Sequence, residues 1–126
     1  MTTQQIAAMV EGFGLPYAYD HFSPPPQHPL PAPPFLCFFY PNSDDVYADN
    51  RNYQAISEVH IELYTEQKDL ALEARSEAAL TANELPWDKE ETYLGGEQLH
   101  MVTWECEAGI TNGGNENGSY LGNGWP

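Results

Sequence analysis

Apolar and polar residues alternate along residues 58–65, and this alternation is the clearest structural signal in the chain. Three apolar residues share one side of an extended backbone: Val59, Ile61 and Leu63. The residues between them share the other side: Glu58, His60, Glu62 and Tyr64. Because side chains point alternately to the two faces of a strand, this segment predicts a strand with one buried face. Its other face is polar and acidic, so it is either exposed to water or set against something basic.

Further strands are expected on either side of this segment. Residues 35–40 form a continuous apolar and aromatic run, which is typical of a buried strand. Residues 87–94 and 98–106 also have an extended pattern, and Gly95-Gly96 between them is a strong hairpin signal.

Two helices are predicted. Residues 3–12 carry Thr3 as a candidate cap and an apolar stripe formed by Ile6, Met9 and Val10. Residues 68–82 have the highest helix propensity in the chain. We expect the small residues of this second helix to lie against the sheet, flanked by two leucines: Ala71, Ala74 and Ala78, with Leu70 and Leu80.

These elements predict a single α+β domain over residues 1–110, with a small, mainly antiparallel sheet of about four strands and two helices on one face. The length of 126 residues and a hydrophobic content of 41 % are sufficient for one core. No apolar run approaches the ~20 residues of a membrane span, and the first residues do not resemble a secretory signal. Cys37 and Cys106 lie in apolar runs, where buried thiols without a disulfide are expected.

Two segments depart from this compact pattern. Residues 24–34 hold seven of the eleven prolines and predict an extended arm, because proline lacks the amide donor and restricts φ. A ligand for an SH3-like groove is the alternative interpretation, although no basic residue flanks the prolines. Residues 111–126 are rich in glycine and asparagine and predict a C-terminal tail, in which Tyr120, Leu121 and Trp125 are candidate anchors for a neighbouring surface.

The chain is strongly acidic, with 19 acids, four bases and a net charge of −15. This balance argues against a protein that binds the phosphate backbone of nucleic acids, which requires surface lysine and arginine. It is compatible with simple solubility, with repulsion between copies, or with basic partners.

No catalytic constellation is evident in the sequence. Neither a nucleotide-binding glycine loop nor a paired-cysteine motif is present, and no serine lies in a nucleophile elbow. We therefore expect no enzyme activity, no catalytic residue, no metal and no cofactor. Two metal hypotheses are the alternatives: a His/Glu site from His60 and Glu62 with His100 nearby, and a calcium site at Asp44, Asp45 and Asp49, which lack the EF-hand pattern.

Four segments together resemble a family of phage proteins. They are residues 14–22 (Gly-Leu-Pro-Tyr-Ala-Tyr-Asp-His-Phe), 33–41 (Pro-Pro-Phe-Leu-Cys-Phe-Phe-Tyr-Pro), 48–50 (Ala-Asp-Asn) and 58–69 (Glu-Val-His-Ile-Glu-Leu-Tyr-Thr-Glu-Gln-Lys-Asp). The chain resembles, over roughly residues 1–110, small tail proteins of siphophages and of prophages of Gram-positive bacteria, which are similar to tail terminator (tail completion) proteins. Residues 58–69 are the most specific element of this resemblance.

The resemblance implies a structural virion protein with an α+β fold that forms a hexameric ring, caps the tail tube and joins it to the head. The implied partners are copies of the chain itself, the major tail tube protein and the head-tail connector or head completion protein. No membrane is involved, and DNA only passes through the lumen. The implied location is the tail or neck of the virion, and the host cytoplasm during assembly.

The long proline run and the tail after Ile110 depart from the family pattern, so both are candidate arms between subunits. Seven residues form the candidate interface: Glu58, His60, Glu62, Tyr64, Tyr120, Leu121 and Trp125. Two other classes stay open at this point. One is a monomeric acidic interaction module, such as a DNA mimic that inhibits a protein with a basic groove. The other is a small metal hydrolase that uses His60 and Glu62.

Overall fold

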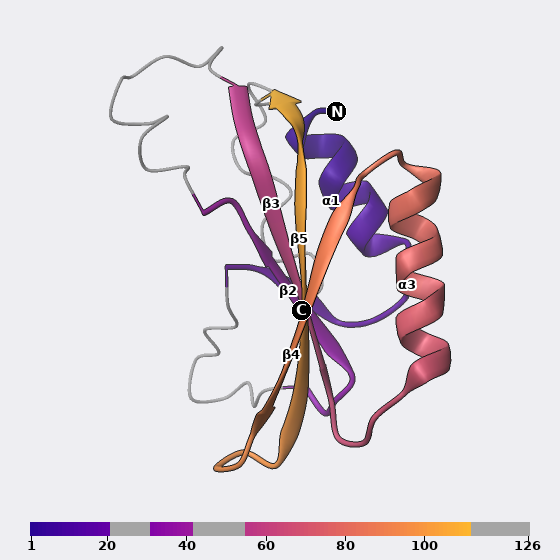
Figure 1. Cartoon of the computed structure of the whole chain (residues 1–126), viewed down its shortest axis with the longest axis vertical. Helices are drawn as coiled ribbons and strands as arrows, with labels where there is room; N and C mark the ends of the chain where they lie inside the picture. Colours follow the sequence, from indigo (N-terminus) through magenta and orange to yellow (C-terminus); the bar gives the residue numbers. More distant parts are fainter. Residues whose placement is uncertain (21–30, 42–54, 112–126) are drawn as a thin grey trace.

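The computed structural model describes residues 1–20, 31–41 and 55–111 (Figure 1). In chain order, its elements are α1 (Thr3–Glu11), β1 (Tyr17–Tyr19), β2 (Phe35–Phe39), β3 (Ala55–Thr65), α3 (Leu70–Ala82), β4 (Trp87–Leu94) and β5 (Leu99–Thr111). The predicted arm at residues 24–34 is described only in part, and the predicted tail lies almost wholly outside these ranges.

The five strands form one mixed, mostly antiparallel sheet in the order β1-β2-β3-β5-β4. β1 and β2 run parallel, while the β2–β3, β3–β5 and β4–β5 pairs are antiparallel. The predicted α+β class with two helices is therefore confirmed. The sheet has one strand more than expected, because the short segment Tyr17–Tyr19 pairs with β2. Both helices lie on the same face of the sheet (Figure 1).

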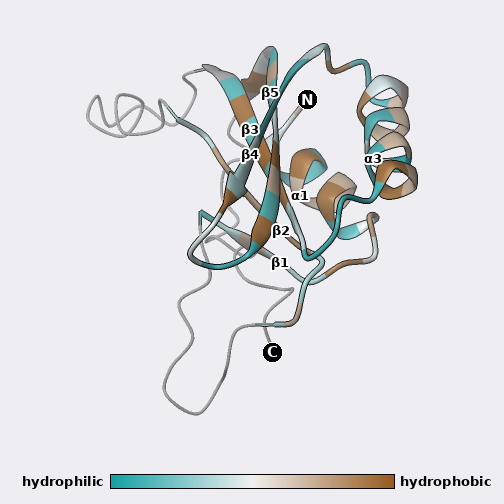
Figure 2. Ribbon diagram, turned by 60° about the horizontal axis from the view of Figure 1, so that its bottom comes forward, coloured by the Kyte–Doolittle hydropathy of each residue, from teal (hydrophilic) through white to brown (hydrophobic). Residues whose placement is uncertain are grey.

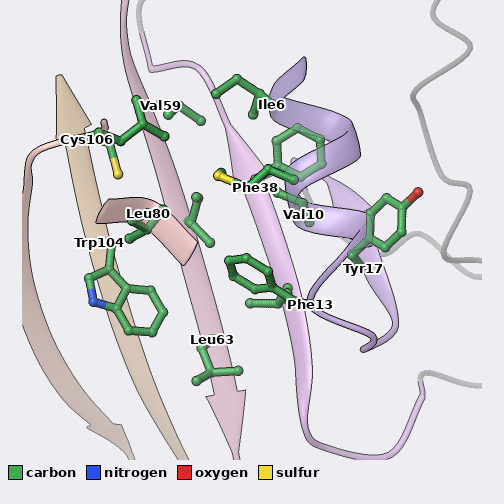
Figure 3. Packing of buried hydrophobic residues seen from close by; sticks show 14 of the residues in the cluster. Ile6, Val10, Phe13, Tyr17, Phe38, Val59, Leu63, Leu80, Trp104 and Cys106 are labelled. Carbon is green, nitrogen blue, oxygen red and sulfur yellow. The ribbon is translucent and has the colours of Figure 1, made fainter. Parts of the chain in front are cut away.

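The hydrophobic core lies between this face and the helices (Figure 3). Phe38, Ile61 and Trp104 are aligned in register across β2, β3 and β5, and all three are fully buried. Ile6 and Val10 of α1 pack against the same core. The alternation predicted for residues 58–65 is confirmed, since its three apolar residues have no exposed surface and the polar residues between them point the other way. Figure 2 shows the same alternation as changing hydropathy along the central strands.

The cap of the first helix lies one residue before the predicted one. Thr2 is the N-cap, and its hydroxyl accepts a hydrogen bond from the Gln5 amide at 3.1 Å, while the Gln5 side chain accepts one from the Thr2 amide at 2.8 Å. This reciprocal capping box satisfies two amides that the helix itself leaves unpaired. Thr3 is instead the first helical residue and is buried, so its assignment as the cap was wrong.

The orientation predicted for α3 was also wrong. The alanines expected to face the sheet, Ala71, Ala74 and Ala78, are exposed, and Leu70 is 68 % exposed. The helix instead buries the side formed by Leu72, Glu73, Ser76 and Leu80. Two leucines bury more apolar area than three alanines do, and Glu73 finds cationic partners on that side. The helix starts at Leu70 rather than Lys68, because the Asp69 carboxylate caps it by accepting from the Leu72 amide at 3.0 Å.

The predicted hairpin is confirmed, with a longer turn than the two glycines suggested. Leu94 pairs with Leu99, so the turn contains four residues, and Gln98 rather than a glycine has the left-handed φ of 56°. The second strand continues to Thr111, beyond the predicted end at residue 106, because the start of β3 pairs with it. Cys37 and Cys106 are buried and form no disulfide, as expected.

A pair of substitutions tests the orientation of α3. Leu80→Ala should lower the free energy of unfolding by about 2–5 kcal/mol, because it leaves a cavity in the core. Ala74→Gln should change it by less than about 0.5 kcal/mol, because that position is exposed. Urea denaturation followed by circular dichroism measures both. A comparable loss in the two variants would contradict the observed orientation.

Candidate functional site

The face of the sheet opposite the helices is covered by no helix in the described ranges (Figure 1). We call this surface the open face. Strand register defines its members, because residues directly opposite each other on paired strands share a face. His60 of β3 lies opposite Glu105 of β5, which lies opposite Asp88 of β4. Residues two positions apart on one strand also share a face. The open face therefore extends along and across β3, β5 and β4.

The β3–β5–β4 part of the open face is acidic. Six carboxylates belong to it: Glu58, Glu62, Asp88, Glu90, Glu105 and Glu107. Glu58 and Glu107 are directly opposite, and His60 lies next to Glu105. No lysine or arginine of the described strands belongs to this face. We call these six residues the acidic half.

The part of the open face near β2 is aromatic. The ring of Phe35 stacks on Tyr64 with centroids 4.9 Å apart, and Phe39 meets His60 edge-on at 5.2 Å. Their four rings form two pairs that bridge β2 and β3, and we call them the aromatic half. Phe35 is buried and the other three rings are partly buried, so this half is a packed group of rings directly beside the carboxylates.

A hydrogen bond links the two halves. The Tyr64 hydroxyl donates to Glu62 Oε1 at 2.8 Å. Burial, followed by the hydrogen bond and the charge of Glu62, raises the pKa of Tyr64 well above its usual range. Tyr64 therefore remains a donor at physiological pH and holds the Glu62 carboxylate in place.

His60 is the one nitrogen base among the open-face residues defined above. Its Nε2 lies 3.8 Å from Glu58 Oε2, which is too long for a hydrogen bond but within ion-pair range when the ring is protonated. The buried Nε2 has no hydrogen-bond partner in the part of the chain that the structure describes. The ring thus sits between an aromatic neighbour and two carboxylates.

Ionic contacts are concentrated on the helix side instead. Lys89 Nζ lies 2.9 Å from Glu73 Oε1 and 2.8 Å from Glu77 Oε2, which also accepts a hydrogen bond from Trp104 Nε1 at 3.1 Å. Lys68 Nζ lies 2.7 Å from Glu73 Oε2 and also contacts Glu91. We call this group of side chains the charged cluster: Lys68, Glu73, Glu77, Lys89 and Glu91. It attaches α3 to β4.

The contacts within the charged cluster stabilise the ionised forms of Glu73 and Lys89. Burial opposes ionisation of Glu73, but the hydrogen bonds from Lys68 and Lys89 outweigh it and lower the pKa of this carboxyl. The hydrogen bonds to Glu73 and Glu77 raise the pKa of Lys89. The third described base, Arg75, donates to the Phe13 carbonyl at 3.3 Å on the same side of the sheet. All described lysines and arginines therefore make their contacts on the helix side of the sheet, and none of them neutralises the carboxylates of the open face.

The structure describes the four strand residues of the candidate interface but not its three tail residues. Glu58, His60, Glu62 and Tyr64 lie together on the open face, as their alternation indicates. Tyr120, Leu121 and Trp125 lie outside the described residues. The predicted interface does not include Asp88, Glu90, Glu105 and Glu107. Alternation along β5 was a usable signal for Glu105 and Glu107, whereas β4 has no alternation of apolar and polar residues. Only the strand register shows that they continue the acidic surface of β3.

The His/Glu metal hypothesis finds no support from the strand register, and the calcium hypothesis is not tested by the described residues. His60 lies opposite Glu105, whereas His100 lies opposite Thr65, so the two histidines are five positions apart along the ladder and on opposite faces. Within residues 1–20, 31–41 and 55–111, no group of three or more histidine, cysteine, aspartate or glutamate side chains could hold a metal ion. Asp44, Asp45 and Asp49 lie outside these ranges.

No protein-family model, curated protein or solved structure matches the chain. Neither helix in the described part is long and apolar enough to cross a membrane. The resemblance to tail terminator proteins therefore stays a prediction from the sequence, and the open face is the structural feature that bears on function.

Replacing the central carboxylate of the charged cluster tests its contribution. Because the pKa of Glu73 is lowered from an ordinary value of 4.5, its ionised form stabilises the fold above that pH, and the contribution is lost as the pH falls through the lowered pKa. Glu73→Gln should lower the free energy of unfolding by about 2 kcal/mol at neutral pH. The difference from the parent protein should shrink progressively as the pH is lowered below 4.5, as urea titrations at neutral and at acidic pH would show.

Glu66→Gln is the matched control, because Glu66 is exposed and lies outside the charged cluster. It should change stability by less than about 0.5 kcal/mol. A deficit of Glu73→Gln that persists in acid, or an equal loss in the control, would contradict the role of the cluster.

Proposed function

We propose that this chain is a structural protein of a tailed bacteriophage virion, a tail terminator or tail completion subunit. Its copies form a ring, a hexamer by family resemblance, that caps the tail tube and joins it to the head-tail connector. The observation that carries the proposal is the open face, because the described helices lie on one side of the sheet only and its other side gathers carboxylates and partly buried rings that can contact a partner.

The two halves of the open face suit two kinds of contact. Aromatic side chains contribute strongly to protein interfaces, because they bury large area at low cost in conformational entropy. In the proposed ring, the aromatic half packs against a neighbouring subunit. The acidic half then meets basic patches of the connector or faces the lumen, where carboxylates repel DNA and keep its passage free of adhesion.

The proposal assigns no catalytic residue, metal or cofactor to the chain. Its partners are copies of itself, the major tail tube protein and the head-tail connector or head completion protein, and DNA passes only through the lumen. The protein acts in the tail or neck of the virion and is assembled in the host cytoplasm. The proline arm and the C-terminal tail would add contacts between subunits.

Reversing charges on the open face tests the proposal. The parent protein should form rings in negative-stain images and bind tubes of the major tail protein or the connector. Glu58→Lys with Glu62→Lys should weaken that assembly about tenfold or more, since close charge pairs across an interface are coupled by about 1.5–7 kcal/mol. Glu11→Lys with Glu66→Lys changes the net charge equally at exposed positions away from this face and should assemble normally.

Multi-angle light scattering and co-sedimentation with tubes give the readouts. A parent protein that stays monomeric at high concentration and binds neither tubes nor connector would overturn the ring. Equal weakening in both double variants would show that net charge, and not the open face, controls assembly.

A monomeric acidic interaction module is the second candidate function. The acidic half favours it, because carboxylates on neighbouring strands recur about 4.8 Å apart across the sheet and about 6.8 Å along a strand. Such a regular array could occupy a basic groove that normally holds nucleic acid. A monomer that displaces DNA from a basic protein in a salt-dependent way would favour this candidate over the ring.

A further inference from the structure

We propose that the outer edge of β4 is a docking site for an extended basic segment of a partner protein, which adds to the sheet as a further strand. This inference goes beyond the proposed function, because it applies equally to a ring subunit and to a monomeric binding module. It rests on the hydrogen-bonding geometry of the edge and on the charges beside it.

β4 is the last strand in the sheet order, and β5 is its one partner in the described structure. Its eight residues, Trp87–Leu94, pair with β5 in an unbroken register. Neither a proline nor a register shift interrupts it. The opposite edge, β1, has only three residues. A regular edge of this length offers a row of backbone donors and acceptors to an incoming strand.

The hydrogen-bond pattern identifies the groups on that edge. The Glu107 amide donates to the Pro86 carbonyl at 3.4 Å, and these two residues continue the register of the β4–β5 pair. Hydrogen-bonded and non-hydrogen-bonded pairs alternate along an antiparallel ladder. Asp88, Glu90 and Thr92 therefore bond to β5. The alternate residues direct their amides and carbonyls outward: Trp87, Lys89, Glu91 and Tyr93.

Charges beside the edge select the incoming side chains. On the open face, Asp88 and Glu90 lie where an added strand would pair with β4, and Glu105 lies opposite Asp88 on β5. On the helix side, the charges of Lys89 and Glu91 are already satisfied by the charged cluster. Lysine or arginine on one side of an incoming strand would meet Asp88 and Glu90, while its other side would lie near the 56 % exposed Tyr93.

The same carboxylates disfavour a second copy of this chain as the occupant. If two β4 edges paired, the Asp88 and Glu90 side chains of both copies would gather on one face. Like charges on adjacent strands are destabilising. The β4 edge thus repels a second β4 strand and attracts a basic one. Attraction of one partner together with repulsion of another gives binding its specificity.

Hydrogen exchange of the full chain, followed by NMR, tests the site. The probe is an acetylated and amidated eight-residue peptide in which lysine alternates with threonine and valine. Its binding should slow exchange at the amides of Lys89, Glu91 and Tyr93 at least about tenfold, and leave Asp88 and Glu90, already bonded to β5, unchanged. The same peptide with glutamate in place of lysine should give no protection.

Two variants separate backbone pairing from charge. Tyr93→Pro removes one outward amide and leaves the β5 ladder intact, so it should weaken peptide binding at least about fivefold relative to Tyr93→Ala, which loses the same ring but keeps the amide. Asp88→Asn with Glu90→Gln should weaken binding about three- to tenfold, since each cross-strand charge pair is worth ~0.2–1 kcal/mol.

Three outcomes would overturn the proposal. The first is peptide binding without protection of the outward amides, which means diffuse electrostatic attraction. The second is protection that appears with rising protein concentration and no peptide, which means pairing between copies. The third is no binding of the lysine peptide by a parent protein that NMR shows to be folded.

Discussion

The contact of Glu73 with Lys68 and Lys89 is the interaction on which most of this structure depends. It places a buried carboxylate of α3 between a lysine that precedes the helix and a lysine of β4. Without partners, a carboxylate at this depth would strongly disfavour the observed orientation of the helix. With them, α3 turns its alanines outward and seats Leu72 and Leu80 in the core.

This contact also decides the electrostatics of the opposite face. The chain has only four lysines and arginines, and the charged cluster holds two of them on the helix side. The carboxylates of β3, β5 and β4 on the open face therefore have no lysine or arginine beside them in the described structure. Core packing and surface charge are thus coupled, because the lysines that stabilise the helix side cannot also neutralise the carboxylates of the open face.

The pairing of β3 with β5 joins separate stretches of sequence into one surface. It sets Glu58 against Glu107 and His60 against Glu105, and it aligns Ile61 with Trp104 in the core. β2 then adds aromatic rings beside Tyr64 and His60. Carboxylates and rings beside a β4 edge that has no second strand partner in the described residues suit a protein that works by assembly, and this is the physical basis of the proposed virion role.

Local patterns by themselves determined four of the five described strands, the hairpin, the two helices and the composition of both faces of residues 58–65. Alternation and turn residues act over a few positions, so they can be read without the fold. Tertiary structure decided the side of α3 that is buried, because Glu73 finds its lysines only once the helix lies over β4. It also decided the fifth strand, the opposite faces of His60 and His100, and the union of six carboxylates on one surface. These features depend on strand register between distant segments, which alternation within a single segment does not specify.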